Sequence, residues 1–264
     1  MYLSEPIHAL KSKAKKLKKE TGMTSVQALD QIARQEGFNS WSLLSSRKDL
    51  FFPQCYNNLL DYFNNGDIVL IGARPGIGKT TFTIGLFVKA IQKMTVPNYF
   101  FSLSEIYNDV VRRINYYDKD LIPDNKFFIL NYSNDISADY IIRFTENTVK
   151  EGSLIIIDYL QLLDEKRKNP PLQKQLENLK QYAKDKKCII ILISQISREL
   201  EYKKEKIPTI KDIRLPNPLD LSLINKILLL YRKTKDSETA KVYLNTNPEK
   251  SFIVNYSKEK KIFY

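Results

Sequence analysis

The chain has 264 residues, 43% of them hydrophobic and 27% charged, and its formal net charge is +12. This length suits one medium domain with a small appendage, and no apolar run approaches the ~18 residues of a membrane span. One histidine, two cysteines and a lysine-rich start exclude a zinc site, a disulfide framework and a secretory signal, so we expect a protein of the reducing cytoplasm with no membrane partner.

Residues 1–48 are predicted to form a small basic helical module. Apolar residues recur at helical spacing between His8 and Glu20, and Thr24 or Ser25 can cap a second helix that ends near Gly37. We expect a short third turn to bury Trp41 against both helices. The lysines of this module leave three interpretations open, namely DNA binding, partner binding and a solvated basic helix face.

Residues 49–264 alternate between short apolar β-prone runs and amphipathic segments. The predicted helices are 55–63, a helix that ends near 93, a helix through 110–114, 138–150 and 172–186. The predicted strands are 68–71, 98–103, 127–130, 154–158, 188–194, 226–231, 242–245 and 252–255. This alternation predicts an α/β fold with a mostly parallel central sheet covered on both faces, and the β-rich tail predicts antiparallel strands at one edge.

A glycine-rich turn separates the first strand of this sheet from its first helix. The stretch 72–80 reads Gly-Ala-Arg-Pro-Gly-Ile-Gly-Lys-Thr, which fits a phosphate-binding loop except that Ala73 stands at the first glycine position. Lys79 is expected to reach the phosphates of ATP, and Thr80 or Thr81 to place a hydroxyl on Mg²⁺. The alternative is a glycine turn that binds nothing. The predicted nucleotide-binding residues are Arg74, Pro75, Gly76, Ile77, Gly78, Lys79, Thr80 and Thr81.

Three polar residues at the ends of other predicted strands are candidates for the chemistry. Asp158 ends a buried strand and could order a Mg²⁺-bound water beside the phosphate loop, whereas the alternative is a simple turn aspartate. Glu105 could position the attacking water or merely favour a helix dipole. Gln195 could sense the terminal phosphate or couple it to bound DNA.

The positive net charge points to a polyanionic partner such as nucleic acid, although lysines that only solvate the surface would give the same excess. Arg198 and Arg214 are candidate contacts to phosphate or nucleic acid. Surface ion pairing is the alternative for both.

Several motifs in order resemble the RecA-like ATPase domain of the DnaB family of replicative helicases. They are Gly72-Ala-Arg-Pro-Gly-Ile-Gly-Lys-Thr80, Phe101-Ser-Leu103, Ile156-Ile-Asp-Tyr-Leu-Gln-Leu162, Ser194-Gln-Ile-Ser-Arg198, Asp212-Ile-Arg214 and Tyr231-Arg232. The resemblance runs from about residue 56 to the end of the chain. It implies a RecA-like P-loop NTPase that forms a ring, hydrolyses ATP between subunits and moves on single-stranded DNA.

The resemblance also implies that two loops face a DNA channel. They are residues 164–171, after the strand that ends at Asp158, and residues 198–208, after the strand that ends in Ser194-Gln195. Both loops are basic here, as a path for a phosphate backbone requires. Their lysines and arginine are Lys166, Arg167, Lys168, Lys203, Lys204 and Lys206.

The sequence departs from the family in three places. Ser104 stands where the family has its catalytic glutamate, which leaves Glu105 one residue late. Thr246 and Pro248 stand where the family has a lysine and an arginine that reach a neighbour's nucleotide. The short basic module replaces the family's usual N-terminal primase-interacting domain.

Two hypotheses follow. The first is a DnaB-like ATPase and helicase that binds single-stranded DNA in the replication of a phage, plasmid or other mobile element. The second is a degenerate nucleotide-binding paralogue that acts as a loader, adaptor or decoy for a replicative helicase. A RecA-like recombination or clock-type ATPase is a more distant alternative.

Overall fold

The computed structural model describes residues 7–46, 59–102, 107–121, 127–133, 135–164, 169–203, 206–215, 217, 219–245 and 250–264. The chain divides into two compact units, Met1–Asn58 and Leu59–Tyr264, which we describe separately. The predicted boundary between residues 48 and 49 lies outside the described residues.

The described part of the first unit is helical, as predicted. Its helices are α1 (Ile7–Thr21), α2 (Ser25–Gln35) and α3 (Trp41–Ser46). Thr24 rather than Ser25 caps α2, because its hydroxyl accepts from the Gln27 amide at 3.3 Å while the Gln27 side chain accepts from the Thr24 amide at 2.9 Å. The buried core is Leu10, Ala14, Ala28, Ile32, Ala33, Phe38 and Leu44.

The prediction that the third turn buries Trp41 against the other two helices is confirmed only in part. Leu44 is fully buried, whereas Trp41 is partly buried and packs at the margin of the core. Trp41 begins α3, and its amide donates to the Asp30 carboxylate at 2.7 Å. This contact keeps Trp41 at the end of the helix, so that Leu44, one turn later, fills the core.

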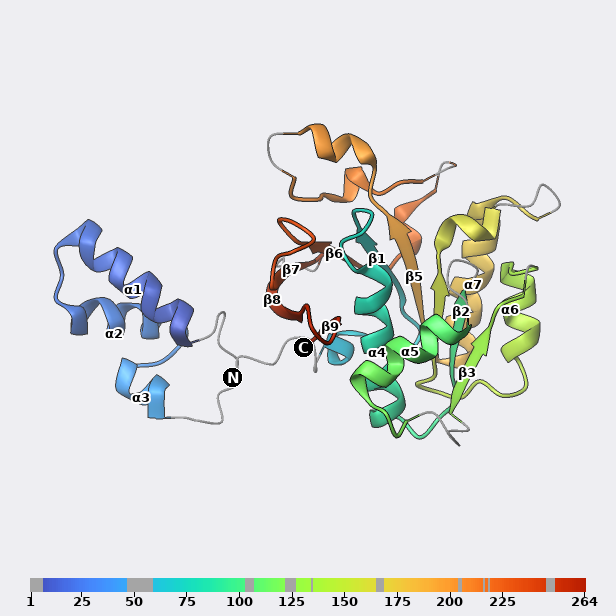
Figure 1. The fold of residues 1–264 in the computed structure, drawn as a ribbon, viewed down its shortest axis with the longest axis horizontal. Coiled ribbons are helices and arrows are strands. Elements are labelled where there is room, and N and C mark those ends of the chain that lie inside the picture. Colours follow the sequence, from blue (N-terminus) through green and yellow to red (C-terminus); the bar gives the residue numbers. More distant parts are fainter. Residues whose placement is uncertain are drawn as a thin grey trace. The chain divides into compact units, whose positions relative to one another are not determined.

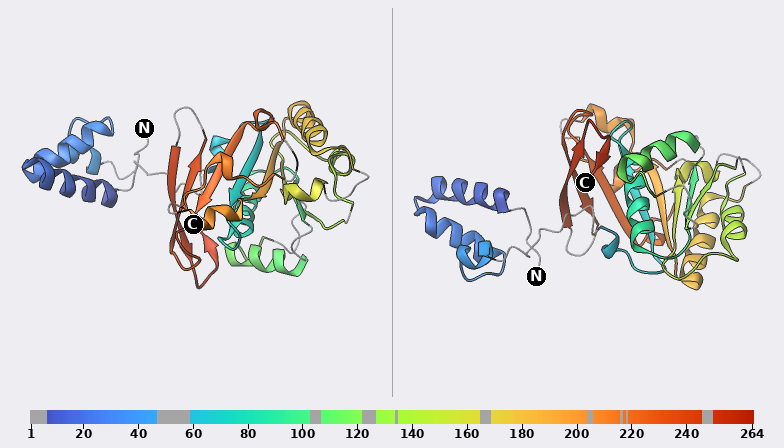
Figure 2. Two further views of the ribbon diagram at one scale, coloured as in Figure 1. Left: turned by 90° about the horizontal axis from the view of Figure 1, so that it is seen from above. Right: turned by 60° about the horizontal axis from the view of Figure 1, so that its bottom comes forward.

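The second unit is built on a sheet whose described strands have the order β3-β2-β4-β5-β1-β6-β7-β8-β9 (Figure 1). The strands are β1 (Ile68–Ala73), β2 (Asn98–Ser102), β3 (Phe128–Asn131), β4 (Leu154–Asp158), β5 (Ile189–Gln195), β6 (Lys226–Tyr231), β7 (Thr239–Leu244), β8 (Lys250–Ser257) and β9 (Ile262–Phe263). The pairs from β3 to β6 are parallel, and β7, β8 and β9 add antiparallel strands beyond β6. Figure 2 shows these last strands, in red, at one edge of the sheet.

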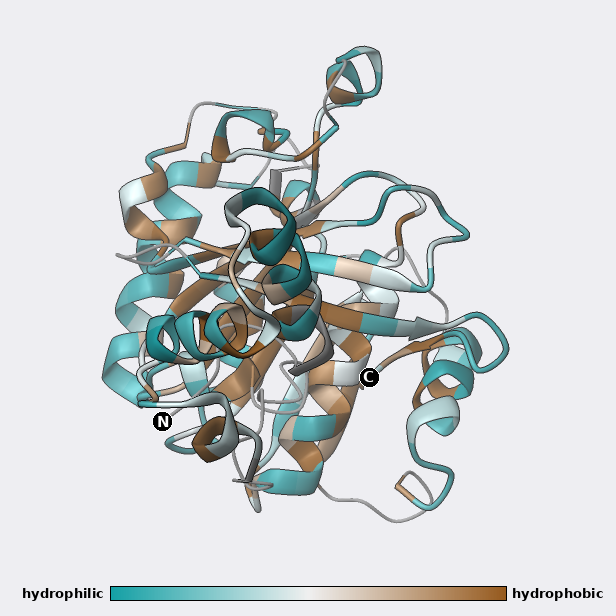
Figure 3. Cartoon of the chain, turned by 90° about the vertical axis from the view of Figure 1, so that its left-hand side faces the viewer, coloured by the Kyte–Doolittle hydropathy of each residue, from teal (hydrophilic) through white to brown (hydrophobic). Residues whose placement is uncertain are grey.

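Helices cover both faces of the parallel part of the sheet. Helices α4 (Lys79–Lys93) and α5 (Tyr107–Tyr117) lie on one face, and α6 (Ala138–Thr145) and α7 (Leu172–Lys186) lie on the other. Ile68 and Leu70 of β1 pack in one cluster with residues of α6 and α7, while the intervening Val69 is fully buried as well. Strands covered on both faces explain the continuous apolar runs in the sequence. In Figure 3 the helices are banded in brown and teal, as amphipathic helices should be.

The predicted fold class is confirmed, and the differences lie at the ends of elements. Helix α6 stops at Thr145 instead of running to residue 150, and just beyond it the Thr148 amide donates to the Thr145 carbonyl three residues back, as in a tight turn. Within the described residues, the predicted helix 55–63 is reduced to a 3₁₀ turn at Leu59–Tyr62. Strand β9 was not predicted, since two residues are too short to show a pattern.

In the part of the chain that the structure describes, no helix is long and apolar enough to cross a membrane.

Candidate nucleotide-binding site

The glycine-rich turn forms an open loop between β1 and α4. Gly76 and Gly78 have φ values of 73° and 99°, in the left-handed region that glycine adopts without strain. Gly78 is the N-cap of α4, and it makes no side-chain capping hydrogen bond to the first turn of the helix. An uncapped helix N-terminus beside positive-φ glycines is the arrangement that binds phosphate oxygens.

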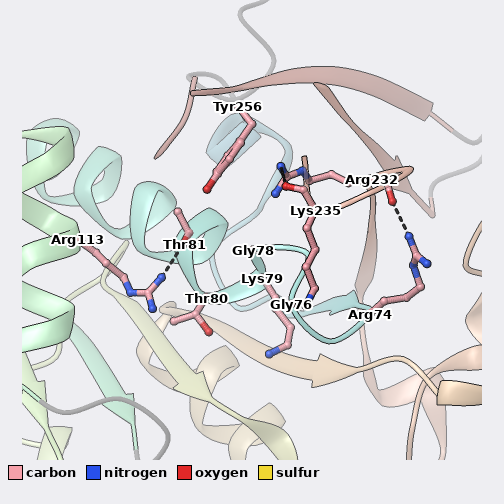
Figure 4. Close-up of a pocket in the computed structure, with 10 residues that line it drawn as sticks. All are labelled: Arg74, Gly76, Gly78, Lys79, Thr80, Thr81, Arg113, Arg232, Lys235 and Tyr256. Carbon is pink, nitrogen blue, oxygen red and sulfur yellow. Dashed lines mark hydrogen bonds between the residues drawn. The ribbon is translucent and has the colours of Figure 1, made fainter. Parts of the chain in front are cut away.

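A pocket of about 440 Å³ lies against this loop (Figure 4). It combines the loop with side chains from α5, from the β6–β7 turn and from β8. Its lining residues are Arg74, Gly76, Gly78, Lys79, Thr80, Thr81, Arg113, Arg232, Lys235 and Tyr256. The described lining contains five cationic side chains and no carboxylate, so the pocket favours a polyanion.

The structure brings Thr80 and Asp158 together at the carboxyl end of the sheet. The Thr80 hydroxyl donates to Asp158 Oδ2 at 3.2 Å, and Asp158 is 1% exposed. Thr80 lies in the first turn of α4, the helix that follows β1, and Asp158 is the last residue of β4. Strand β5 lies between β1 and β4. A hydroxyl and a carboxylate in contact beside a phosphate loop are oxygen ligands of the kind that Mg²⁺ prefers.

Contacts with α5 determine whether Thr80 or Thr81 faces Asp158. Arg113 donates to the Thr81 hydroxyl at 2.7 Å, and the Tyr117 hydroxyl donates to the Thr81 carbonyl at 3.1 Å. Thr81 is therefore held against α5, which leaves Thr80 as the metal candidate. No sequence pattern singles out Arg113, because its role depends on the packing of α5 against α4.

Arg74 lines the pocket, but its guanidinium is engaged by other residues of the protein. Its guanidinium donates to both carboxylate oxygens of Glu201, at 2.9 and 3.0 Å, and to the Arg232 carbonyl at 2.5 Å. Burial alone would raise the pKa of Glu201, but hydrogen bonds from Lys206 and Arg74 and the charge of Arg74 lower it. We therefore expect the guanidinium of Arg74 to hold the loop in place and not to contact the nucleotide.

Arg232, which directly follows β6, also contacts the glycine loop. Its guanidinium is 2% exposed and donates to the carbonyls of Ile77 at 2.9 Å, Lys235 at 2.6 Å and Ser237 at 2.7 Å. It also lies 3.9 Å from the centre of the Tyr256 ring. Burial lowers the pKa of Arg232, although an arginine stays charged at neutral pH. We did not predict this role, but Arg232 directly follows β6, the strand beside β1, and that position is a usable signal.

Gln195 lies at the end of β5 opposite Ala73 in the strand register. It is not among the described residues that line the pocket. Its carbonyl accepts from the Arg214 amide at 2.8 Å. Gln161, just after β4, donates to the Ser194 hydroxyl at 3.1 Å and to the Arg214 carbonyl at 2.7 Å. These bonds tie the ends of β4 and β5 to the segment before β6.

The cations predicted to contact nucleic acid differ in their surroundings. Arg198 and Arg214 are exposed. Lys203 is paired with Asp212 at 2.6 Å, and Lys206 with Glu201 at 3.3 Å. The other predicted residues lie outside the described residues: Ser104, Glu105, Lys166, Arg167, Lys168, Lys204, Thr246 and Pro248.

Because Lys203 and Asp212 form an ion pair, we expect part of the stability of the fold to be lost in acid. Burial opposes ionisation of Asp212, but donation from Lys203 and Thr209 outweighs it and lowers the pKa of the carboxyl. The stabilisation is complete above the pKa of an aspartate in the unfolded chain, about 4. It is lost as the pH falls through the lower pKa of Asp212 in the folded protein. We expect Asp212→Asn to reduce the free energy of unfolding by about 2 kcal/mol at pH 7. Urea denaturation followed by circular dichroism should show this difference shrinking below about pH 4.

The matched control for this prediction is Glu199→Gln. Glu199 is exposed and lies in the same segment, so this change should leave stability within about 0.5 kcal/mol of the wild type. A difference between wild type and Asp212→Asn that stays constant from pH 7 to pH 3 would contradict the role assigned to Asp212.

Comparison with known proteins agrees with this geometry. The family described as "DnaB-like helicase C terminal domain" matches residues 54–127 and 124–260. The replicative DNA helicase DnaB of Mycoplasma pneumoniae is 25% identical over 264 residues, which cover 83% of this chain and 54% of the helicase. A probable plasmid replicative DNA helicase of Chlamydia psittaci is 26% identical over 222 residues, which cover 71% of this chain and 48% of that protein. The chain thus spans about half the length of these relatives.

A solved structure, that of a DnaB-like replicative helicase described with its interactions with primase, has the same fold. Its TM-score is 0.65 at 18% sequence identity, and the superposition covers 97% of this chain and 75% of that chain. The match to the family over most of the second unit confirms the resemblance that the motifs predicted. The chain belongs to the family of DnaB-like helicase C-terminal domains.

Proposed function

We propose that this chain is an ATP-hydrolysing, DnaB-type ATPase that binds single-stranded DNA. The observation that carries the proposal is the contact between Thr80 and Asp158 beside an uncapped, glycine-rich loop. A loop that only turned the chain would not need a buried carboxylate from β4 against the first hydroxyl of α4.

The residues of the pocket fit a nucleoside triphosphate with its metal ion. The amides at the start of α4 and the Lys79 amine bind the phosphates, and Thr80 and Asp158 would hold Mg²⁺. Magnesium would supply positive charge that offsets the negative charge of the phosphates. Glu105 is the proposed group that orients the attacking water, and Gln195 would link the nucleotide to the segment around Arg214 through its place at the end of β5.

Single-stranded DNA is the proposed polymer, and a ring of identical subunits is the proposed assembly. The net charge of +12 and the exposed Arg198 and Arg214, on the segment that follows β5, support a phosphate backbone as ligand. The similarity to a probable plasmid replicative helicase supports a role in the replication of a phage, plasmid or other mobile element.

The test is steady-state ATP hydrolysis with Mg²⁺, measured with and without single-stranded DNA. We expect turnover that rises several-fold with DNA and that disappears in Lys79→Ala, because that change removes the amine of the phosphate loop. Size-exclusion chromatography with light scattering, with and without ATP, should show a higher-order assembly. Absence of turnover in a protein that still binds ATP would reject the motor.

One observation favours the second candidate, a nucleotide-binding loader or adaptor of a replicative helicase. Lys203 and Lys206, which a DNA channel would need, are both paired with carboxylates. A stable monomer that binds ATP, does not hydrolyse it and associates with a replicative helicase would support this candidate.

A further inference from the structure

The β6–β7 turn places a second lysine on the glycine loop. A Cβ atom built on Gly76 would lie 2.6 Å from Lys235 Cε and 3.0 Å from Lys235 Nζ. In Figure 4 the Lys235 side chain runs from the turn to Gly76, and its amine ends beside that glycine. Lys235 and Lys79 line the same pocket, although they are far apart in the chain. The absence of a side chain at Gly76 is what gives Lys235 room.

The backbone of Lys235 is fixed to the loop that its side chain reaches. Arg232 donates to the carbonyls of Lys235 and Ser237 and also to the carbonyl of Ile77 within the glycine loop. The turn is closed by hydrogen bonds between Thr234 and Ser237, at 3.0 Å from amide to hydroxyl and 3.2 Å from amide to carbonyl. Lys235 therefore approaches the pocket from a rigid support, which lowers the entropic cost of binding a ligand.

The three arginines that line the pocket are already engaged by other groups of the protein. Arg74 is paired with Glu201, Arg232 with backbone carbonyls, and Arg113 with Thr81. For Lys235, no ion pair and no side-chain hydrogen bond is present among the described residues. Its ammonium carries three donors and lies in a strongly cationic pocket, so an anionic ligand is the partner that would stabilise it there.

We propose that Lys235 is a second phosphate-binding lysine, supplied by the same chain, that contacts the terminal phosphate of the bound nucleoside triphosphate. The inference rests on the nucleotide binding proposed above and names one more residue of that site. The terminal phosphate is the assigned partner because Lys79 reaches the β and γ phosphates, and Lys235 ends in the same pocket beside the loop. The γ phosphoryl oxygens also carry the charge that a further cation stabilises in phosphoryl transfer.

The test compares nucleotide affinities of the full chain and its variants by isothermal titration calorimetry. The probes are ADP and a non-hydrolysable ATP analogue, each with Mg²⁺. We expect Lys235→Ala to weaken binding of the triphosphate about tenfold and that of ADP less than about threefold, since charge-assisted hydrogen bonds are the strong ones. Lys235→Arg should restore most of the triphosphate affinity.

The matched control is Lys233→Ala, which removes another exposed lysine of the same turn that is not among the residues lining the pocket. It should bind both nucleotides as the wild type does. Equal affinities of Lys235→Ala and wild type, or equal losses for the two nucleotides, would overturn the assignment. Tighter binding by Lys235→Ala would also overturn it, because the amine would then block the pocket.

The two proposals fail in different ways. If the wild type binds neither nucleotide, the proposed function and the assignment of Lys235 fall together. If the wild type binds the triphosphate and Lys79→Ala does not, while Lys235→Ala is unchanged, only the assignment of Lys235 falls.

Discussion

Asp158→Asn is expected to lower ATP turnover by about 100-fold or more, as the loss of a preorganised charge in an active site typically does. Asparagine keeps the shape of the side chain but removes the negative charge that faces the Thr80 hydroxyl at 3.2 Å. The phosphate loop itself is unchanged, so ADP affinity without Mg²⁺ should stay within about threefold of the wild type. Steady-state hydrolysis and calorimetric ADP titrations with and without Mg²⁺ measure the two effects separately.

The control for this variant is Asp139→Asn, which changes an exposed carboxylate in the first turn of α6. It should hydrolyse ATP at the wild-type rate. Turnover by Asp158→Asn within about threefold of the wild type would show that the carboxylate does not take part in catalysis. The proposed metal site would then be wrong, even if the loop binds phosphate.

Arg232→Met is expected to cost about 3–5 kcal/mol of stability, the range seen when one partner of a buried charged network is removed. Three backbone carbonyls lose their donor, and the stacking on Tyr256 at 3.9 Å is lost. For a unit of this size the melting temperature should fall by about 10 °C. Thermal unfolding followed by circular dichroism gives the shift. Nucleotide affinity should fall as well, since the loop loses the bond to Ile77.

Two further substitutions separate the geometry of Arg232 from its charge. Arg232→Lys keeps the charge but cannot reach three carbonyls in different directions, so it should recover only a small part of the stability. Arg143→Met, on the exposed surface of α6, should leave the melting temperature nearly unchanged. A melting temperature of Arg232→Met within about 2 °C of the wild type would contradict the role of this side chain.

The part of the site that the sequence predicts is the part held by local structure. The loop before Lys79 and the strand that ends at Asp158 are continuous stretches, and parallel strands present their carboxyl ends at one edge of the sheet. The alternation of apolar runs with amphipathic segments likewise predicts the fold class, since every central strand is covered on both faces.

The part that the sequence does not predict depends on contacts between distant segments. Arg113 reaches Thr81 from α5, and Arg232 and Lys235 reach the glycine loop from the β6–β7 turn. Pattern and propensity contain no information about which cation receives a carboxylate partner. Lys203 could therefore be assigned to nucleic acid from the sequence, whereas the fold places Asp212 against it.

The bond between Arg74 and Glu201 joins two parts of the site that would otherwise act separately. Arg74 belongs to the loop that holds the nucleotide, and Glu201 belongs to the basic segment after β5, where it also accepts from Lys206. A ligand that draws Glu201 out of this bond would leave Arg74 held by backbone carbonyls alone and could alter the loop. Thermodynamic reciprocity then requires the nucleotide to change the affinity for that ligand by the same factor. The pair of Arg74 and Glu201 would thus couple the glycine loop to any ligand of the segment after β5, which lies at the same edge of the sheet.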